Sequence, residues 1–421
     1  MTSTPAKAPL VMVLSGRRTV DKLKAAGYRV GLVANSIPLD LALLVDLPIE
    51  ADLDDWAQVS AQVQRAHRYN PVAAVVTQLE NLLPLAGRLR DLLGLSTGVT
   101  EQAVRNCADK ATTNRLLARA GIGVARSRVV DSPESAVAAA RELGLPVIVK
   151  PRNASSAAGL MCCERLDMAG EAVRDILAAG WQSALVEEFL DGAEIVLFAY
   201  RSRGATSVIS TLDAQVGPPP KFVKLGGCHP SRVAAGRLDE LSALTDRALA
   251  AVGLDNWVAT VQVMLTADGP KVIEINPRVP GGQTVSLIAE TTGYEPTLVA
   301  VEAALGRLPQ PGPVRASVGW YRGITFDTAG SLSYRPEAQH AVPGLESRVA
   351  PLIDIDVRPG EQVLPRNHPR GGVFGRIVLC GQDEAQLERD YQRVLAALEL
   401  RLEPVPEAGD EASWRPHSRC C

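Results

Sequence analysis

The first hundred residues alternate short apolar runs with helical patterns, and this alternation most constrains the fold. The apolar runs predict strands over residues 10–14, 29–34 and 72–77, and the patterns after them predict helices around 20–26 and 82–93. Strands that alternate with helices form a parallel sheet, because the chain must cross back over the sheet before each new strand. We therefore expect a doubly wound α/β domain over residues 1–106.

The size and composition of the chain limit its partners. Its 421 residues exceed what one core usually holds, and domains of roughly 100–200 residues predict about three units. With 44 basic and 47 acidic side chains, the formal charge of -3 is too balanced for a protein that binds nucleic acid or a membrane surface. No run approaches the ~20 apolar residues of a spanning helix. The start resembles a first strand rather than a signal peptide. We expect small-molecule partners and a cytoplasmic location.

The rest of the chain divides into three further segments. Residues 107–310 predict a central α+β domain, in which residues 124–190 form a small unit able to move as a lid. A proline-rich stretch over 309–313 marks the next boundary, and residues 311–404 predict a β-rich module with one closing helix over 384–398. Residues 405–421 lack periodicity and are expected to be disordered. Within the central domain, 192–310 predict a hairpin-rich sheet and two helices.

Two common nucleotide-binding motifs are absent from the sequence. A dinucleotide fingerprint would place G-x-G-x-x-G after the first strand, but the chain has Ser15-Gly16-Arg17-Arg18 there. The sequence contains no G-x-x-x-x-G-K-[ST] segment either. A bound nucleotide is therefore held by neither a Rossmann turn nor a P-loop.

Residues 260–278 predict a hairpin with an Asp-Gly turn. Because strand side chains alternate, Glu274 and Asn276 should share one face, with Ile273 and Ile275 on the other. Mg²⁺ prefers oxygen ligands and is usually held by one or two carboxylates together with substrate phosphates. Arg278 follows where a guanidinium could reach a transferring phosphoryl group. The alternative interpretation is that Glu274 and Asn276 face solvent at a sheet edge.

A second candidate binding segment lies in the expected lid. The apolar strand before Lys150 leads into a loop of small residues, which includes Ser155, Ser156 and Gly159. Backbone N–H groups of such a loop can approach phosphate oxygens closely, and the lysine adds positive charge. A solvated lysine at a strand end is the alternative. Downstream, Leu185–Glu194 predicts a strand-like hinge whose amides could contact adenine and whose carboxylates could contact ribose.

The order and spacing of these segments resemble the ATP-grasp enzymes, and within them the L-amino-acid ligases, over residues 10–400. Asp109-Lys110 and Val149-Lys150-Pro151 match two family segments whose lysines contact ATP phosphates. The family's Glu-Glu-Phe hinge matches Glu187 to Glu194. This match implies that Glu187 and the Leu190 backbone contact adenine and that Glu194 contacts ribose. Glu188 and Phe189 lie between them in the same nucleotide-binding hinge.

The family's Glu-x-Asn-Pro-Arg motif matches residues 274–278. The resemblance implies that Glu274 and Asn276 bind Mg²⁺, with Mn²⁺ as an alternative ion, and that Arg278 stabilises the transferred phosphoryl group and the tetrahedral intermediate. It also implies substrate contacts at Gly281-Gly282 and at His229, for which a core or surface histidine is the alternative. The segments 358–361 and 370–375 resemble the extra C-terminal domain of those ligases.

One residue departs from the family pattern. Gln262 occupies the position where the family normally has a further acidic metal ligand. A glutamine carbonyl can bind Mg²⁺, but the site then carries one negative charge fewer.

The resemblance predicts an ATP-dependent ligase that couples a small carboxylate, expected to be an amino acid, to an amine through an acyl phosphate. Two alternatives stay open: a biotin-carboxylase-like carboxylating enzyme and a non-catalytic nucleotide-binding relative. Related enzymes are often dimers, which leaves a homodimer open.

Overall fold

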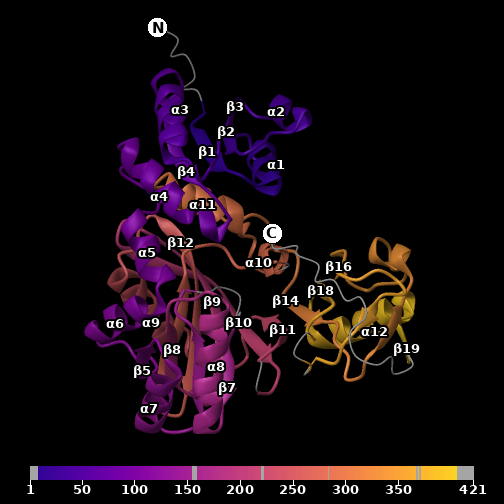
Figure 1. Ribbon diagram of the computed structural model, residues 1–421. Coiled ribbons are helices and arrows are strands. Elements are labelled where there is room, and N and C mark those ends of the chain that lie inside the picture. Colours follow the sequence, from indigo (N-terminus) through magenta and orange to yellow (C-terminus); the bar gives the residue numbers. More distant parts are fainter. Residues whose placement is uncertain are drawn as a thin grey trace.

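The computed structural model describes residues 8–153, 159–219, 222–282, 284–366, 368 and 371–404. One large sheet contains strands of the central and C-terminal segments, and the N-terminal unit and the lid lie beside it (Figure 1). Ser155 and Ser156, predicted to bind phosphate, and the predicted disordered tail over 405–421 lie outside the described residues.

The N-terminal unit contains a four-stranded sheet in the order β3-β2-β1-β4. The sheet is parallel, as predicted, but β3 was not among the three predicted strands. The strands are β1 (Leu10–Leu14), β2 (Arg29–Ala34), β3 (Leu47–Glu50) and β4 (Val72–Val76). The helices are α1 (Arg17–Ala25), α2 (Leu39–Leu44), α3 (Trp56–Tyr69), the 3-10 turn η1 (Glu80–Leu82) and α4 (Leu83–Leu92). Strand order reverses between β1 and β4, and ligands of open α/β sheets bind beyond the strand ends at such a point.

Two helices connect this unit to the lid. They are α5 (Glu101–Ala108) and α6 (Lys110–Arg119). Asp109 separates them and caps α6, because its carboxylate accepts hydrogen bonds from the amides of Ala111 and Thr112. This N-cap places Lys110 in the first turn of α6.

The lid is a four-stranded sheet in the order β5-β8-β6-β7, with two helices packed against it. Its elements are β5 (Ser127–Val130), α7 (Pro133–Leu143), β6 (Val147–Pro151), β7 (Met161–Cys163), α8 (Leu166–Ala178) and β8 (Ala184–Glu188). Its apolar side chains form a cluster of their own, in which Val149, Val173 and Val186 are fully buried. A separate core allows the lid to move as one body.

The large sheet has eight strands in the order β13-β12-β9-β10-β11-β14-β18-β16. From the central domain come β9 (Ala193–Ser202), β10 (Ala205–Val216), β11 (Lys224–His229), β12 (Trp257–Thr266) and β13 (Gly269–Asn276). The same stretch contributes α9 (Leu238–Ala251), α10 (Thr284–Thr292) and α11 (Pro296–Ala304). The prediction of two helices over 192–310 is wrong. α10 and α11 are separate because the short segment at 293–295 contains Gly293, whose φ is +76°.

The C-terminal segment adds strands to this sheet. It contains β14 (Val318–Gly323), β15 (Gly330–Ser333), the 3-10 turn η2 (Pro336–Gln339), β16 (Leu352–Ile355), β17 (Gln362–Val363), β18 (Gly375–Gly381), α12 (Glu384–Leu398) and β19 (Arg401–Glu403). β14, β18 and β16 extend the large sheet, while β17, β15 and β19 form a small sheet. The expected boundary near 310 falls between α11 and β14, but the pairing of β14 with β11 carries the sheet across it. None of the described helices is long and apolar enough to cross a membrane.

Candidate active site

The β12–β13 hairpin places Gln262 directly opposite Glu274 and Thr260 opposite Asn276. The register shifts between Gln262 and Val263, which leaves Ile273 as an extra, unpaired residue of a β-bulge. Because of this bulge, the buried partner of Ile275 on the inner face is Val272, and not Ile273 as the simple alternation predicts. Glu274, Asn276 and Gln262 still share one face of the sheet.

Glu274 pairs with a lysine from α6. Lys110 Nζ lies 3.0 Å from Glu274 Oε1, and Gln262 Nε2 donates to Glu274 Oε2 at 3.3 Å. Burial alone would raise the pKa of Glu274. The effect of burial is outweighed by the charge and hydrogen bond of Lys110, a hydrogen bond from Asn276 and the charge of Lys150. Together they hold the pKa of Glu274 below its usual value. Glu274 is therefore an ionised carboxylate that Lys110 contacts directly and that the more distant charge of Lys150 also stabilises.

The second lysine pairs with the hinge. Lys150 Nζ on β6 lies 2.6 Å from Glu187 Oε2 on β8, and both side chains are 8% exposed. Asn114 Nδ2 on α6 donates to the other oxygen of Glu187 at 3.0 Å. The buried Glu187 therefore connects two lid strands to the helix that carries Lys110.

A second ion pair joins the lid to α6. Arg152 donates through Nε to Asp109 Oδ1 at 2.7 Å and through Nη2 to Asp109 Oδ2 at 2.5 Å. These hydrogen bonds lower the pKa of Asp109 to about 2, although burial opposes them. The bidentate pair holds the end of β6, and with it Lys150, beside the first turn of α6.

The remaining hinge residues have different surroundings. Glu188 accepts hydrogen bonds from Arg126 and Lys271, and the Phe189 ring stacks on Phe222 with 6.2 Å between the centroids. Leu190 lies half-buried between β8 and β9. Glu194 lies on β9, with Lys224 Nζ 3.5 Å from its Oε1. Only Glu187 among these side chains contacts a predicted phosphate-binding lysine.

Arg278 reaches the N-terminal unit. Its Nε donates to Glu80 Oε2 at 2.9 Å, and Glu80 stands just beyond the end of β4. The two residues are thereby brought together at the switch point of the parallel sheet. Gly281 lies beside the Arg278 guanidinium, and Gly282 has a φ of +62°, which favours glycine.

His229 ends β11 and is 8% exposed. Its Nδ1 lies 3.0 Å from Thr211 O, and a carbonyl oxygen only accepts, so Nδ1 carries the hydrogen. Burial lowers the pKa of His229 despite this hydrogen bond, so the ring is neutral at pH 7 with Nε2 free to accept. No described contact joins His229 to Arg278.

Sequence reasoning missed four residues of the site: Asn114, Arg152, Glu80 and Lys271. Asn114 could have been found, because it follows Lys110 by four residues and so shares its helix face. Arg152 lies in the turn directly after β6, two residues from Lys150, but that position alone did not predict its partner. Glu80 and Lys271 gave no local signal, since their partners lie far away in the sequence.

The donor atoms fit a hard divalent cation in combination with phosphates. No group of three or more His, Cys, Asp or Glu side chains in the described part of the chain could hold a metal alone. Glu274 supplies the one charged ligand of the predicted set, and the amide oxygens of Asn276 and Gln262 would complete it. Mg²⁺ usually takes one or two carboxylates and keeps phosphate and water ligands, so this set fits Mg²⁺ shared with a nucleotide.

In this fold Lys110 of α6 pairs with Glu274 of β13, and Lys150 of the lid pairs with Glu187 of the neighbouring lid strand. A protein-family model described as "ATP-grasp domain" matches residues 143–286, which run from the lid to the start of α10. This part of the chain therefore matches an ATP-grasp domain.

Individual relatives agree with this class. The chain is 24% identical over 353 residues to the uncharacterized protein y4rH of Sinorhizobium fredii, covering 82% of this chain and 71% of that protein. It is 26% identical over 303 residues to a D-alanine–D-alanine ligase of Desulforudis audaxviator, covering 66% and 87%. The solved L-amino acid ligase of Bacillus licheniformis has a TM-score of 0.75 at 19% identity, covering 95% of this chain and all of that one.

The fold alone does not separate the ligase from the carboxylase alternative. A biotin carboxylase of Campylobacter jejuni has a TM-score of 0.65 at 16% identity, covering 93% of this chain and 92% of that one. The choice between the two depends on the chemistry of the site.

Proposed function

We propose that the protein is an ATP-dependent ligase that joins a small carboxylate, best fitted by an amino acid, to an amine. The observation that carries the proposal is the ion pair of Lys110 with Glu274, four residues before Arg278, with the charge of Lys150 also acting on Glu274. Cations for phosphate, a carboxylate for a divalent ion and a guanidinium for a developing oxyanion are thereby gathered in one place.

The first step is phosphoryl transfer. A carboxylate oxygen of the substrate attacks the γ-phosphorus of ATP, the bond to the β–γ bridging oxygen breaks, and ADP leaves with that electron pair. Lys110 and Lys150 would neutralise charge on the phosphate oxygens, so the contribution of the chain is mostly positioning and electrostatics. Mg²⁺ held by Glu274, Asn276 and Gln262 would supply further charge neutralisation.

The second step forms the amide. The amine attacks the acyl carbon, a tetrahedral oxyanion forms, and the bond to the phosphate oxygen breaks to release phosphate while the nitrogen loses a proton. Arg278 is the donor placed for this oxyanion. The lid would exclude water, which otherwise hydrolyses the acyl phosphate.

The test uses the purified full chain with ATP and Mg²⁺. Phosphate release is measured over a matrix of amino-acid pairs, and products are identified by mass. The ligase proposal expects release only when a carboxylate and an amine are both present, together with an amide of the summed mass less water. Release with bicarbonate alone would support the carboxylating alternative. Absence of ADP formation with every mixture would support the non-catalytic one.

The proposal also covers the location and the partners of the protein. We expect the protein to act in the cytoplasm on small molecules, without nucleic acid or membrane partners. Gel filtration with light scattering would decide between a monomer and a homodimer.

A further inference from the structure

The two adjacent glutamates at the end of β8 face opposite sides. Glu187 is buried against Lys150 and Asn114, whereas Glu188 points away from them toward Arg126 and Lys271. Alternation along a strand requires this split. The predicted nucleotide role of the hinge therefore fits the Glu187 side chain, and the side chain of Glu188 requires another explanation.

Glu188 holds together three segments. Its Oε2 accepts from Arg126 Nε at 2.6 Å, and its Oε1 accepts from the Arg126 amide at 3.1 Å and from Lys271 Nζ at 2.9 Å. Arg126 also donates to Leu143 O at 3.0 Å, at the end of α7. Burial would raise the pKa of Glu188, but the hydrogen bonds from Lys271 and Arg126 lower it to about 2. The carboxylate is thus ionised and fully engaged.

The Lys271 contact crosses from the lid to the large sheet. Lys271 lies on β13, three residues before Glu274, while Glu188 directly follows Glu187 on β8. The ion pair therefore joins the two strands that carry the site carboxylates. The geometry of this ion pair sets the distance between Glu187, on the lid, and Glu274, the predicted metal ligand on β13.

Both chain connections to the lid run beside this contact. The amide of Val272 donates to Gly123 O at 2.8 Å, and a side chain at Gly123 would meet Pro270 O at 2.9 Å. In the returning connection, a side chain at Gly192 would lie 2.3 Å from Leu265 O. Backbone passes directly over backbone at both points, so few side chains hold the lid in place there.

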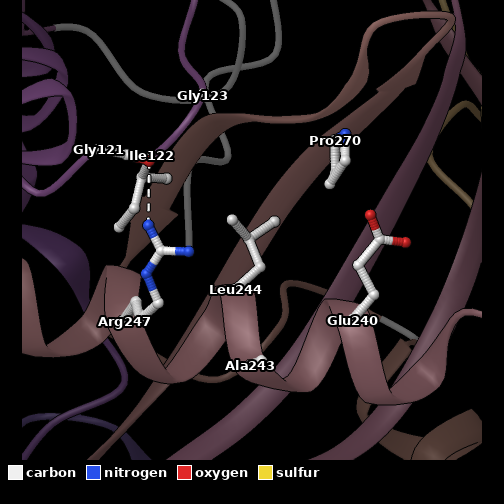
Figure 2. A pocket seen from close by; sticks show the side chains of 8 residues that line it. All are labelled: Gly121, Ile122, Gly123, Glu240, Ala243, Leu244, Arg247 and Pro270. Atoms are coloured by element: carbon white, nitrogen blue, oxygen red, sulfur yellow. Dashed lines mark hydrogen bonds between the residues drawn. The ribbon is translucent and has the colours of Figure 1, made fainter.

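A hollow of about 320 Å³ lies beside the first connection. Figure 2 shows Gly121–Gly123 and Pro270 above the helix α9, with the Arg247 side chain rising from α9 to the glycine segment. Arg247 Nη2 donates to Gly121 O at 3.0 Å and to Ala120 O at 3.2 Å. This end of α6 is fixed to α9, while the hollow leaves the next residues room to shift.

We propose that Glu188, Arg126 and Lys271 form an ionic latch at the lid hinge, in which Glu188 is a positioning residue and does not contact the nucleotide through its side chain. The latch sets the angle of the lid over β13 and so places Lys150 and Glu187 relative to Glu274. The proposal rests on the proposed function for its ADP-binding and turnover readouts, but not for its hydrogen-exchange readout.

The test combines Glu188→Gln, Lys271→Gln and the double variant. The matched control is Glu142→Gln, which removes an exposed ion pair with Arg128 inside the lid. Hydrogen exchange of the Val272 amide reports lid opening, and titration with ADP reports the nucleotide site. Each single variant should speed exchange and weaken ADP binding by about 3- to 10-fold, because one partly buried ion pair is lost.

The double variant should be no worse than the worse single variant, since both remove the same contact. The control should match wild type in both assays. Unchanged exchange in Lys271→Gln, or additive effects in the double variant, would overturn the latch. Failure of wild type to bind ADP would instead sink the proposed function, and the exchange result would still decide the latch. Once a substrate pair is found, the KM for ATP should rise more than kcat falls.

Discussion

Lys110 Nζ lies 3.0 Å from Glu274 Oε1, so the residue assigned to phosphate and the residue assigned to metal neutralise each other in the structure. Binding of Mg²⁺ with ATP would exchange these partners, giving the carboxylate a cation and the ammonium a phosphate. Because the carboxylate–Mg²⁺ and lysine–phosphate contacts are also charge-assisted, they replace the ion pair that is broken. The charges of Lys110 and Glu274 are thus neutralised before the ligand binds. Mg²⁺ or ATP alone must break this ion pair and leaves one of the two residues without a new partner of opposite charge.

Glu274→Gln should separate metal binding from nucleotide binding. The variant removes the one charged metal ligand of the predicted set, and we expect turnover to fall by about 100-fold or more. ADP affinity measured by calorimetry without Mg²⁺ should be unchanged or higher, because Lys110 is released for phosphate. Mg²⁺ should then improve ADP binding less than in wild type. Equal Mg²⁺ enhancement in the variant and in wild type would remove Glu274 from the metal site.

Gln262→Glu places a second carboxylate directly opposite Glu274. Like charges opposite each other destabilise a strand pair, so we expect a loss of about 1 kcal/mol in unfolding free energy without divalent ions. Mg²⁺ or Mn²⁺ should restore the loss, because a cation between two carboxylates is favourable. Thermal unfolding with and without the ion measures both effects.

The control for that variant is Gln392→Glu, an exposed position on α12 next to Glu388. It adds the same charge beside another glutamate, far from the site. Stabilisation of both variants by the ion to the same extent would mean that the ion acts through general charge and not through the predicted site.

Local patterns predicted much of this architecture. The bounds of β1, β2 and α12 follow from signals that lie within or next to each element, such as the Asp383 cap of α12. The bulge at Ile273 was not predicted, because a bulge depends on the pairing strand, which the periodicity of one strand does not contain. The individual motif residues were found, but their partners were not. Arg278 and Glu80 are 198 residues apart, and Asn114 and Glu187 are 73 apart.

Lys150→Met should destabilise the protein as well as inactivate it. It leaves the buried Glu187 with only Asn114 among its described partners, and breaking a buried pair costs about 3–5 kcal/mol. Adding Glu187→Gln should recover most of the stability, because the unpaired charge is removed. Turnover should stay lost in both variants. Chemical denaturation and ADP formation measure the two properties, and recovery of turnover in the double variant would contradict the phosphate role of Lys150.

Asp109 should make stability depend on pH in a narrow acidic window. Its folded pKa of about 2 lies below the usual 3.8, so its pairing with Arg152 stabilises fully above the usual value. That contribution is lost as pH falls through about 2. Asp109→Asn keeps an N-cap but removes the charge, and because Arg152 is partly exposed we expect a cost of about 1 kcal/mol at pH 7. The difference from wild type in urea unfolding should shrink steadily from pH 4 to pH 2. A constant difference would show that the cap and not the ion pair is responsible.

Arg278 should act on the chemical step more than on nucleotide binding. Its guanidinium donates through Nε to Glu80 and through Nη1 to Val279 O, and these bonds fix the plane in which its remaining N–H groups point. Arg278→Lys keeps the charge but loses the planar set of donors, so we expect kcat to fall by about 100-fold with ADP affinity nearly unchanged. Glu80→Gln keeps a hydrogen-bond acceptor for Nε and should lower kcat far less. Phosphate release with the substrate pair and ADP titration measure the two quantities. If Arg278→Lys weakened ADP binding as much as turnover, Arg278 would be a nucleotide ligand, and the tetrahedral intermediate would need a different donor.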